Sequence, residues 1–389
     1  MAAGRTGPRG LALFLLQPGH GATPPSPSAL AAALPGFGFA LLASGRREPG
    51  SSAHAAAELG ALAACGFAYA LALDALPQRP AKRLAVRYRG LDNARLERAQ
   101  RRLRRSLARA TGARLLVTRN AETAARLAEA LLPEGARLLA EARQACERFA
   151  TRPQGRLLAG SVGLRAALEL VDGPAGPRVR KTAKPGFAGY LARELSARRE
   201  LGGRLAAVDP ALAGGEDFVE LPLYRALPLP SLNGLRLLPV AHARAALGAL
   251  EELYRAGYAH LDGNPGSLVY DAGGRPKLID FEYLLRYDAR PASFEEGYDI
   301  AGPPPDYDGP GAGIAASFTS RWQEWIGLDY EQIRRDPSWV QGLRRLGYRL
   351  TGRLPRLLSR PARDGLRWAR DWILALVRSR SGTNDPFLG

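Results

Sequence analysis

Cysteine and lysine are the scarce residues of this 389-residue chain. The two cysteines, Cys65 and Cys146, can form neither a disulfide framework nor a zinc site, so we expect small buried thiols in a reducing compartment. Only four of the 55 cationic residues are lysine, namely Lys82, Lys181, Lys184 and Lys277. This skew toward arginine, together with abundant Ala and Gly, indicates GC-rich codon usage. A retained lysine is therefore more informative here than an arginine.

Long apolar runs are also lacking. The apolar run near the amino terminus is about the minimum length for a signal peptide and has no A-x-A site after it, so we expect a buried strand. The longest uncharged apolar stretch, residues 59–73, contains two glycines and is shorter than the roughly 20 residues of a spanning helix. The sequence therefore predicts no transmembrane segment and a cytoplasmic protein.

Positive charge is present in large excess. The net charge is +18 and the pI is about 10.6, which favours anionic partners: nucleotides, phosphorylated glycans, nucleic acid or an acidic membrane face. Nucleic acid is not expected, because no recognised RNA- or DNA-binding module accompanies the charge. The length of the chain predicts more than one domain.

The first 150 residues alternate short apolar runs with helical ones. We expect strands at 11–16, 38–43, 67–73, 84–88 and 114–117, and helices at 28–34, 52–65, 93–111 and 121–132. This alternation predicts a parallel sheet with crossover helices, a Rossmann-like α/β domain over residues 1–150. Residues 115–127 resemble the strand-to-helix junction of two-domain glycosyltransferases. Gly19 and Gly21 form either a plain turn, which we favour, or a nucleotide or sugar loop.

A different pattern begins near Gln154. Strands are expected at 156–159, 165–171, 178–183 and 218–223, with a D-G-P-A-G-P turn joining the second and third, and helices at 187–201 and 240–256. Antiparallel strands with one helix, a linker and a helical remainder predict an α+β two-lobed domain over residues 151–335. Residues 336–389 form a basic helical tail.

The segment H-L-D-G-N-P-G-S-L-V-Y-D-A-G-G-R-P-K-L-I-D-F-E, from His260 to Glu282, carries the strongest chemical signal. Two predicted strands, at 267–270 and 276–279, would fold back across D-A-G-G and bring Asp262 and Asp280 close together. Phosphoryl transfer needs one carboxylate beside the attacking hydroxyl and another that holds magnesium. Asp262 is therefore the candidate base and Asp280 the candidate metal ligand.

This segment resembles the catalytic and metal loops of the protein-kinase-like superfamily, and most closely those of lipopolysaccharide-core sugar kinases and of aminoglycoside and choline phosphotransferases. The resemblance covers about residues 154–310 and implies ATP and Mg²⁺ as cofactors. It also implies that His260 braces the catalytic loop and does not act as the base.

The same resemblance assigns roles upstream of the motif. Gly160, Ser161 and Gly163 would cover the nucleotide phosphates, and Lys181 would contact them, with Lys184 as the competing lysine. Glu194 would pair with that lysine, with Glu200 as second choice. The alternative is that this segment is simply a solvent-exposed, arginine-rich helix with i,i+4 ion pairs. Glu220 lies where the hinge would contact adenine.

Ser267 departs from the family pattern, because the family places a metal-binding asparagine there. Its hydroxyl is a shorter neutral ligand, so the second metal site is expected to be weaker or completed by water. Asn264 would compensate only in a rearranged loop. This change leaves a catalytically silent nucleotide-binding scaffold as an alternative, whereas Glu282 in place of the motif glycine also occurs in small-molecule kinases.

Two segments after the motif each allow two interpretations. Residues 290–308 are acidic, aromatic and rich in proline, and either shape an acceptor pocket or close the lobe. Within 339–380, Trp368, Trp372 and Leu376 form an apolar stripe among arginines, which suits either an anionic membrane surface or packing on the lobe.

The motif, its resemblance to sugar kinases and the basic tail together predict an ATP-dependent kinase that phosphorylates a hydroxyl of a saccharide or glycolipid, in bacterial cell-surface polysaccharide synthesis at the inner face of the membrane. The alternatives are the silent scaffold of a glycan-assembly complex, or a bifunctional chain whose first domain keeps glycosyltransferase chemistry.

Overall fold

The computed structural model describes residues 8–18, 26–48, 66–78, 91–108, 112–150, 155–162, 164–174, 176–232, 235–312 and 315–349. Several predicted features lie outside these residues: the helix at 52–65, the strand at 84–88, Gly19, Gly21, Gly163 and the tail from residue 350 onward. Packing divides the chain into two compact units, one ending at Gly189 and the other beginning at Tyr190.

The first unit is built on a four-stranded sheet. Its strands are β1 (Leu11–Gln17), β2 (Ala40–Arg47), β3 (Phe67–Leu73) and β4 (Arg114–Val117), in the order β2-β3-β1-β4. Each neighbouring pair is antiparallel. The parallel, Rossmann-like sheet predicted for this region is therefore wrong, although the predicted strands that lie in the described residues are present.

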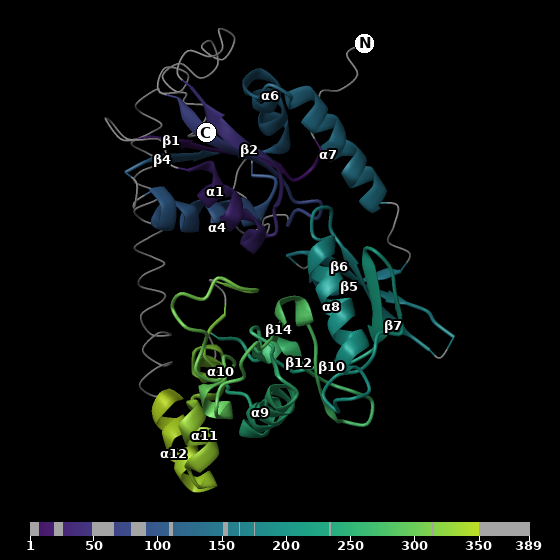
Figure 1. The fold of residues 1–389 in the computed structure, drawn as a ribbon, viewed down its shortest axis with the longest axis vertical. Helices are drawn as coiled ribbons and strands as arrows, with labels where there is room; N and C mark the ends of the chain where they lie inside the picture. Colours follow the sequence, from purple (N-terminus) through teal and green to yellow (C-terminus); the bar gives the residue numbers. More distant parts are fainter. Residues whose placement is uncertain are drawn as a thin grey trace. The chain divides into compact units, whose positions relative to one another are not determined.

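Helices cover both faces of this sheet (Figure 1). Side chains alternate along β1: Ala12, Phe14 and Leu16 pack on the side of α1 (Pro27–Ala33) and α4 (Ala94–Leu103), and Leu11, Leu13 and Leu15 pack on the side of α6 (Ala121–Leu131) and α7 (Gly135–Ala150). A 3₁₀ turn, η1 (Leu34–Phe37), and a π-helical turn, η3 (Arg104–Ala108), extend α1 and α4. Burial on both faces produces the continuous apolar runs that usually mark parallel strands, which explains the error.

Three further strands belong to the same unit. They are β5 (Arg156–Val162), β6 (Ala166–Val171) and β7 (Arg178–Ala183), and they pair antiparallel in succession, as predicted. Just beyond β7, the buried Lys184 pairs with Asp74 at 2.7 Å and donates to the Gly38 carbonyl at 3.1 Å. These contacts join β5–β7 to the N-terminal sheet, so the compact unit extends past the pattern change near residue 150.

Cys146, on α7, is a free and half-buried cysteine. Burial raises the pKa of its thiol to about 11. The side chain packs against the apolar core between the sheet and α6–α7, as expected of a structural thiol.

The second unit contains most of α8 and all later elements. Its helices are α8 (Ala188–Leu201), α9 (Val240–Arg255), α10 (Phe318–Ile326), α11 (Tyr330–Arg335) and α12 (Ser338–Tyr348). Its strands are short: β8 (Ala213–Gly214), β9 (Phe218–Pro222), β10 (Arg225–Ala226), β11 (Tyr258–Ala259), β12 (Leu268–Tyr270), β13 (Pro276–Leu278) and β14 (Leu285–Arg286). The predicted helices at 187–201 and 240–256 are confirmed as α8 and α9.

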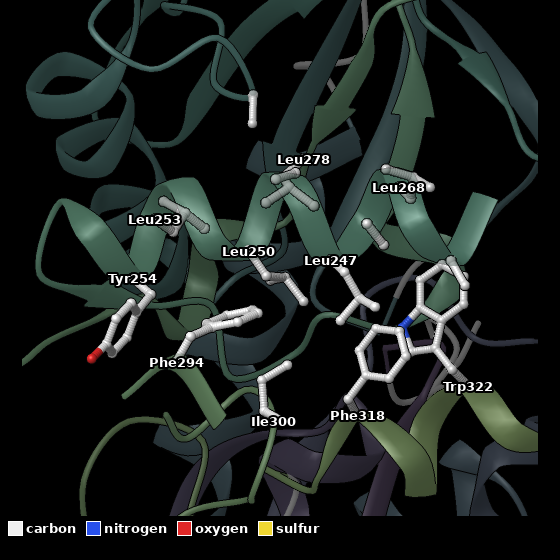
Figure 2. Packing of buried hydrophobic residues seen from close by; sticks show 14 of the residues in the cluster. Leu247, Leu250, Leu253, Tyr254, Leu268, Leu278, Phe294, Ile300, Phe318 and Trp322 are labelled. Carbon is white, nitrogen blue, oxygen red and sulfur yellow. The ribbon is translucent and has the colours of Figure 1, made fainter. Parts of the chain in front are cut away.

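The core of this unit forms around α9 (Figure 2). Leu247, Leu250 and Leu253 recur at helical spacing and are buried with Leu268 and Leu278 of the hairpin, and with the stacked rings of Phe318 and Trp322 from α10. The Trp322 indole donates to the Gly263 carbonyl at 2.7 Å. The core thus fixes both the hairpin and the loop that precedes it.

Within the described residues, no helix combines the length and the apolar character needed to cross a membrane.

Candidate functional site

The predicted hairpin is present and joins the two motif loops. Strands β12 and β13 pair antiparallel, with Leu268 opposite Leu278. The Ile279 N–H donates to the Ser267 carbonyl at 3.0 Å, and the His260 Nε2–H donates to the Ile279 carbonyl at 2.8 Å. The residue before Asp280 is therefore held directly against the loop that carries Asp262.

Backbone strain is concentrated at the same two loops. Among the described residues, only Leu261 (φ 59°) and Asp280 (φ 65°) have a positive φ without being glycine. A left-handed leucine is costly, and such strain is typically retained at functional sites. Leu261 directly precedes Asp262, and the other strained residue is Asp280 itself. An unusual backbone conformation therefore fixes the position of both candidate aspartates.

His260 braces this loop. It is fully buried, and while Nε2–H donates to Ile279, Nδ1 accepts from the Asp262 N–H at 3.3 Å. Both ring nitrogens are engaged in these bonds, so neither is left to contact a bound molecule. The predicted bracing role fits these contacts.

Asp299 holds the strained turn from the other side, and its role was not predicted from the sequence. Its carboxylate accepts from the N–H of His260 at 2.7 Å and from the N–H of Leu261 at 2.9 Å. Burial raises the pKa of Asp299, although these two bonds and the nearby Arg321 and His260 oppose the rise. Asp299 lies in the acidic segment 290–308, so this segment positions the loop that carries Asp262.

Asp262 is partly exposed and oriented through one oxygen. Its Oδ1 accepts from Arg321 Nη1 of α10 at 2.7 Å and from Asn264 Nδ2 at 3.0 Å. Arg321 also donates to the Leu261 carbonyl and to the Ala316 carbonyl. Within the described residues, these side-chain bonds to Asp262 go to Oδ1 and none goes to Oδ2. Arg321 was also missed by the sequence analysis.

Three carboxylates gather at the metal loop. Single oxygens of Glu194, Asp280 and Glu282 lie within 4.8 Å of one another. Such hard oxygen donors suit Mg²⁺, so the residues present fit the predicted ion. Glu194 was expected beside a lysine and Asp280 as a metal ligand; their proximity to Glu282 was not foreseen.

Helix α8 is fixed to this cluster by its own cations. Arg198 is fully buried and pairs with Glu194 at 3.1 Å, while its guanidinium lies 5.1 Å from the centre of the Phe281 ring. Arg193 donates to the Glu282 carbonyl at 2.9 Å. Glu200, the second choice for the helix carboxylate, is exposed. Of the two glutamates considered, Glu194 is therefore the one that lies beside Asp280, and its functional role stays a prediction.

Ser267 has a bracing contact that the metal prediction did not include. Its hydroxyl is buried and donates to the Asp262 carbonyl at 2.7 Å. Asn264 caps the short helix η4 (Pro265–Ser267) through Oδ1 and the Gly266 N–H at 2.7 Å. Both side chains thus stabilise the loop of Asp262, and the role of Ser267 as a metal ligand stays a prediction.

The described residues that are predicted to contact the nucleotide lie on three strands, β5, β7 and β9. Lys181 is buried on β7, opposite Leu168 of β6. Lys184 is held by Asp74, and burial lowers its pKa to about 8, so Lys184 is a poor candidate for a phosphate contact; the role of Lys181 stays a prediction. Glu220 is buried on β9, and its carbonyl accepts from the Leu212 N–H at 2.8 Å. Gly160 and Ser161 lie in β5.

Comparison with models of known protein families finds no match for this chain, and comparison with curated proteins finds no significant similarity.

Proposed function

We propose that this protein is an ATP- and magnesium-dependent phosphotransferase that acts on a hydroxyl group of a saccharide or glycolipid. The observation that carries the proposal is the pair of strained residues, Leu261 and Asp280, at the two aspartates that the motif singles out. The first of these loops is held in place by the Asp299 carboxylate, which accepts from the N–H groups of His260 and Leu261, and by the His260 ring, which donates to the Ile279 carbonyl. A loop held in a costly conformation by buried polar groups is typical of a preorganised site.

Each carboxylate has a distinct task in this proposal. Asp262, fixed through Oδ1 by Arg321, would present Oδ2 to the acceptor hydroxyl and orient it or take its proton. Asp280, Glu194 and Glu282 would hold Mg²⁺, which when bound neutralises charge on the nucleotide phosphates. Lys181 is the proposed phosphate contact. The saccharide acceptor rests on the resemblance of residues 260–282 to sugar kinases.

Association with an anionic membrane face is part of the proposal. On α12, Trp339, Leu343 and Leu346 are 70%, 61% and 50% exposed and share one side of the helix. The opposite side is anchored, since Gln341 donates to backbone carbonyls of α11 and Arg345 donates to the Ile326 carbonyl at 3.0 Å. An exposed apolar stripe on a chain of net charge +18 suits an anionic bilayer.

The function is tested by incubating the purified protein with labelled ATP, Mg²⁺ and a bacterial glycolipid extract. Asp262→Asn and Asp280→Asn should each lower transfer by at least about 100-fold, because each removes a charge that acts on the reacting groups. Asp288→Asn is the matched control, since Asp288 is an exposed aspartate of the same unit. No transfer by the wild type, or equal transfer by all three variants, would refute the proposal.

A nucleotide-binding scaffold is the second candidate, favoured by the contact of Ser267. Its hydroxyl is engaged with the Asp262 carbonyl, where the family pattern has a metal-binding asparagine. Thermal unfolding with ATP and Mg²⁺ separates the candidates, because any ligand selective for the folded state raises its stability. A shift without transfer supports the scaffold, and the absence of both excludes it.

A further inference from the structure

The first unit contains a pocket that the proposed phosphotransferase does not use. It has a volume of about 710 Å³ and lies where α4 and η3 meet β4. This volume is within the usual range of small-molecule sites. The lining residues are mainly polar and include Glu97, Arg101, Arg104, Arg105, Gly112 and Arg114.

The pocket carries an excess of positive charge. Four of its lining residues are arginines, and the single lining carboxylate, Glu97, pairs with Arg101 at 2.6 Å. Within the part of the chain that the structure describes, the side chains of Arg104, Arg105 and Arg114 form no ion pair or hydrogen bond. Three guanidinium groups thus line one pocket without an anionic partner among the described residues.

Local structure directs these arginines to one place. Arg101, Arg104 and Arg105 are spaced i, i+3 and i+4, which puts them on one side of the helix. The helix then passes into the π-helical turn η3, a feature frequent at functional sites. Arg114 approaches from the start of β4, after Gly112, whose φ of +64° forms the turn and which has open space beside its Cα.

The partial negative charge at the end of helix α4 explains only part of this arginine cluster. Cations at the end of a helix are favoured by its partial negative charge, and Arg101 and Arg102 occupy the last turn of α4. That effect does not account for Arg114, which comes from a strand, or for a cavity shared by both elements. Exposed arginines are common in this chain, but among the described residues only four arginines line this pocket.

We propose that this pocket binds a ligand that carries phosphate groups, with Arg104, Arg105 and Arg114 as its charge contacts. The guanidinium fork matches phosphate oxygens in pairs, so arginines with no partner among the described residues favour such groups. The volume exceeds the needs of one inorganic phosphate and accommodates a phosphorylated sugar, either free or as the headgroup of a lipid. The pocket is a second binding site, independent of the carboxylates near Asp280.

The test uses the full chain without nucleotide or magnesium. Binding of glucose 1-phosphate is measured by calorimetry, and binding to phosphatidylglycerol vesicles by sedimentation. The pocket variant combines Arg104→Gln, Arg105→Gln and Arg114→Gln. The control combines Arg98→Gln, Arg102→Gln and Arg143→Gln, which are exposed arginines of the same unit outside the pocket and lower the net charge equally.

We expect the pocket variant to weaken at least one of the two probes by tenfold or more, and the control to weaken it by less than threefold. An effect on glucose 1-phosphate indicates a soluble ligand, and an effect on vesicles alone indicates a lipid headgroup. Equal weakening by both variants would reduce the site to general charge attraction and overturn the proposal. Failure of the wild type to bind either probe would do the same. Circular dichroism at matched temperature confirms that both variants are folded.

Discussion

Arg321 reaches from α10 to the loop of Asp262 and donates to both the Asp262 carboxylate and the Leu261 carbonyl. The planar guanidinium fork presents its N–H donors in fixed directions, so it holds the side chain and the neighbouring carbonyl in one geometry. The side chain of Arg321 is 9% exposed, so water does not replace these contacts readily. Arg321 is therefore a positioning residue for the proposed reaction.

Arg321→Lys should lower the turnover number of phosphate transfer by roughly tenfold to 100-fold and leave the KM for ATP nearly unchanged, because orientation of Asp262 is lost while nucleotide contacts remain. Steady-state kinetics at varied ATP measures both constants. Arg335→Lys, at a side chain that is 78% exposed, is the control. A raised KM with normal turnover would show that Arg321 does not position Asp262.

Asp299 acts on the backbone rather than on a side chain. Asp299→Asn replaces one acceptor oxygen by an amide N–H that faces a backbone donor, so one buried N–H loses its partner. We expect the free energy of unfolding to fall by about 1–3 kcal/mol, measured by urea denaturation. The exposed Asp288→Asn should change it by less than about 0.5 kcal/mol. Equal stability of the two variants would mean that Leu261 is held by other contacts.

The elements of the second unit were predictable where a local signal defined them. The hairpin β12–β13 follows from apolar runs on either side of D-A-G-G, and α9 follows from leucines at helical spacing. Asp299 and Arg321 carry no such signal. One lies 38 residues beyond Leu261 in an irregular segment, and the other is one arginine among many. Only tertiary structure brings either to the loop.

In the first unit the positions of the strands were predictable, but their directions were not. β1 and β3 are apolar on both faces because helices cover the sheet on both sides. An apolar run reports burial and does not report the direction of the neighbouring strand. The pairing of β2 with β3 and of β1 with β4 is fixed by long-range packing.

Helix α12 gives a prediction about membrane binding. Trp339→Ser with Leu343→Ser removes the exposed stripe, so binding to phosphatidylglycerol vesicles should fall by about tenfold or more. The midpoint of thermal unfolding should stay the same, because exposed side chains contribute little to stability. Arg98→Gln serves as a control for a change in charge alone. Lower stability with unchanged vesicle binding would show that this stripe is covered by protein.

At the scale of the whole molecule, Lys184 links segments that are 110 residues apart. Burial lowers its pKa to about 8, from an ordinary value of 10.5. Between these two values the folded state binds fewer protons than the unfolded chain, so this group makes stability rise with pH. Below pH 8 the buried charge opposes folding in full.

Lys184→Met removes this dependence and leaves Asp74 paired with Arg95 at 2.7 Å. As the pH rises from 8 to 10.5, the free energy of unfolding of the wild type should increase by up to about 3 kcal/mol relative to that of Lys184→Met. Urea denaturation across this range measures the difference, with Arg143→Met as a control for an added apolar side chain. Parallel pH profiles for wild type and Lys184→Met would contradict the assignment.

The bonds that hold Leu261 also constrain the order in which the chain can become structured during synthesis. Asp299 and Arg321 follow Leu261 by 38 and 60 residues, so the loop of Asp262 leaves the ribosome well before either of its supports. Left-handed leucine is unfavourable without them. Contacts at such separation form late, since their loop-closure entropy must be overcome first. The proposed active site should therefore be among the last parts of the second unit to acquire its final geometry.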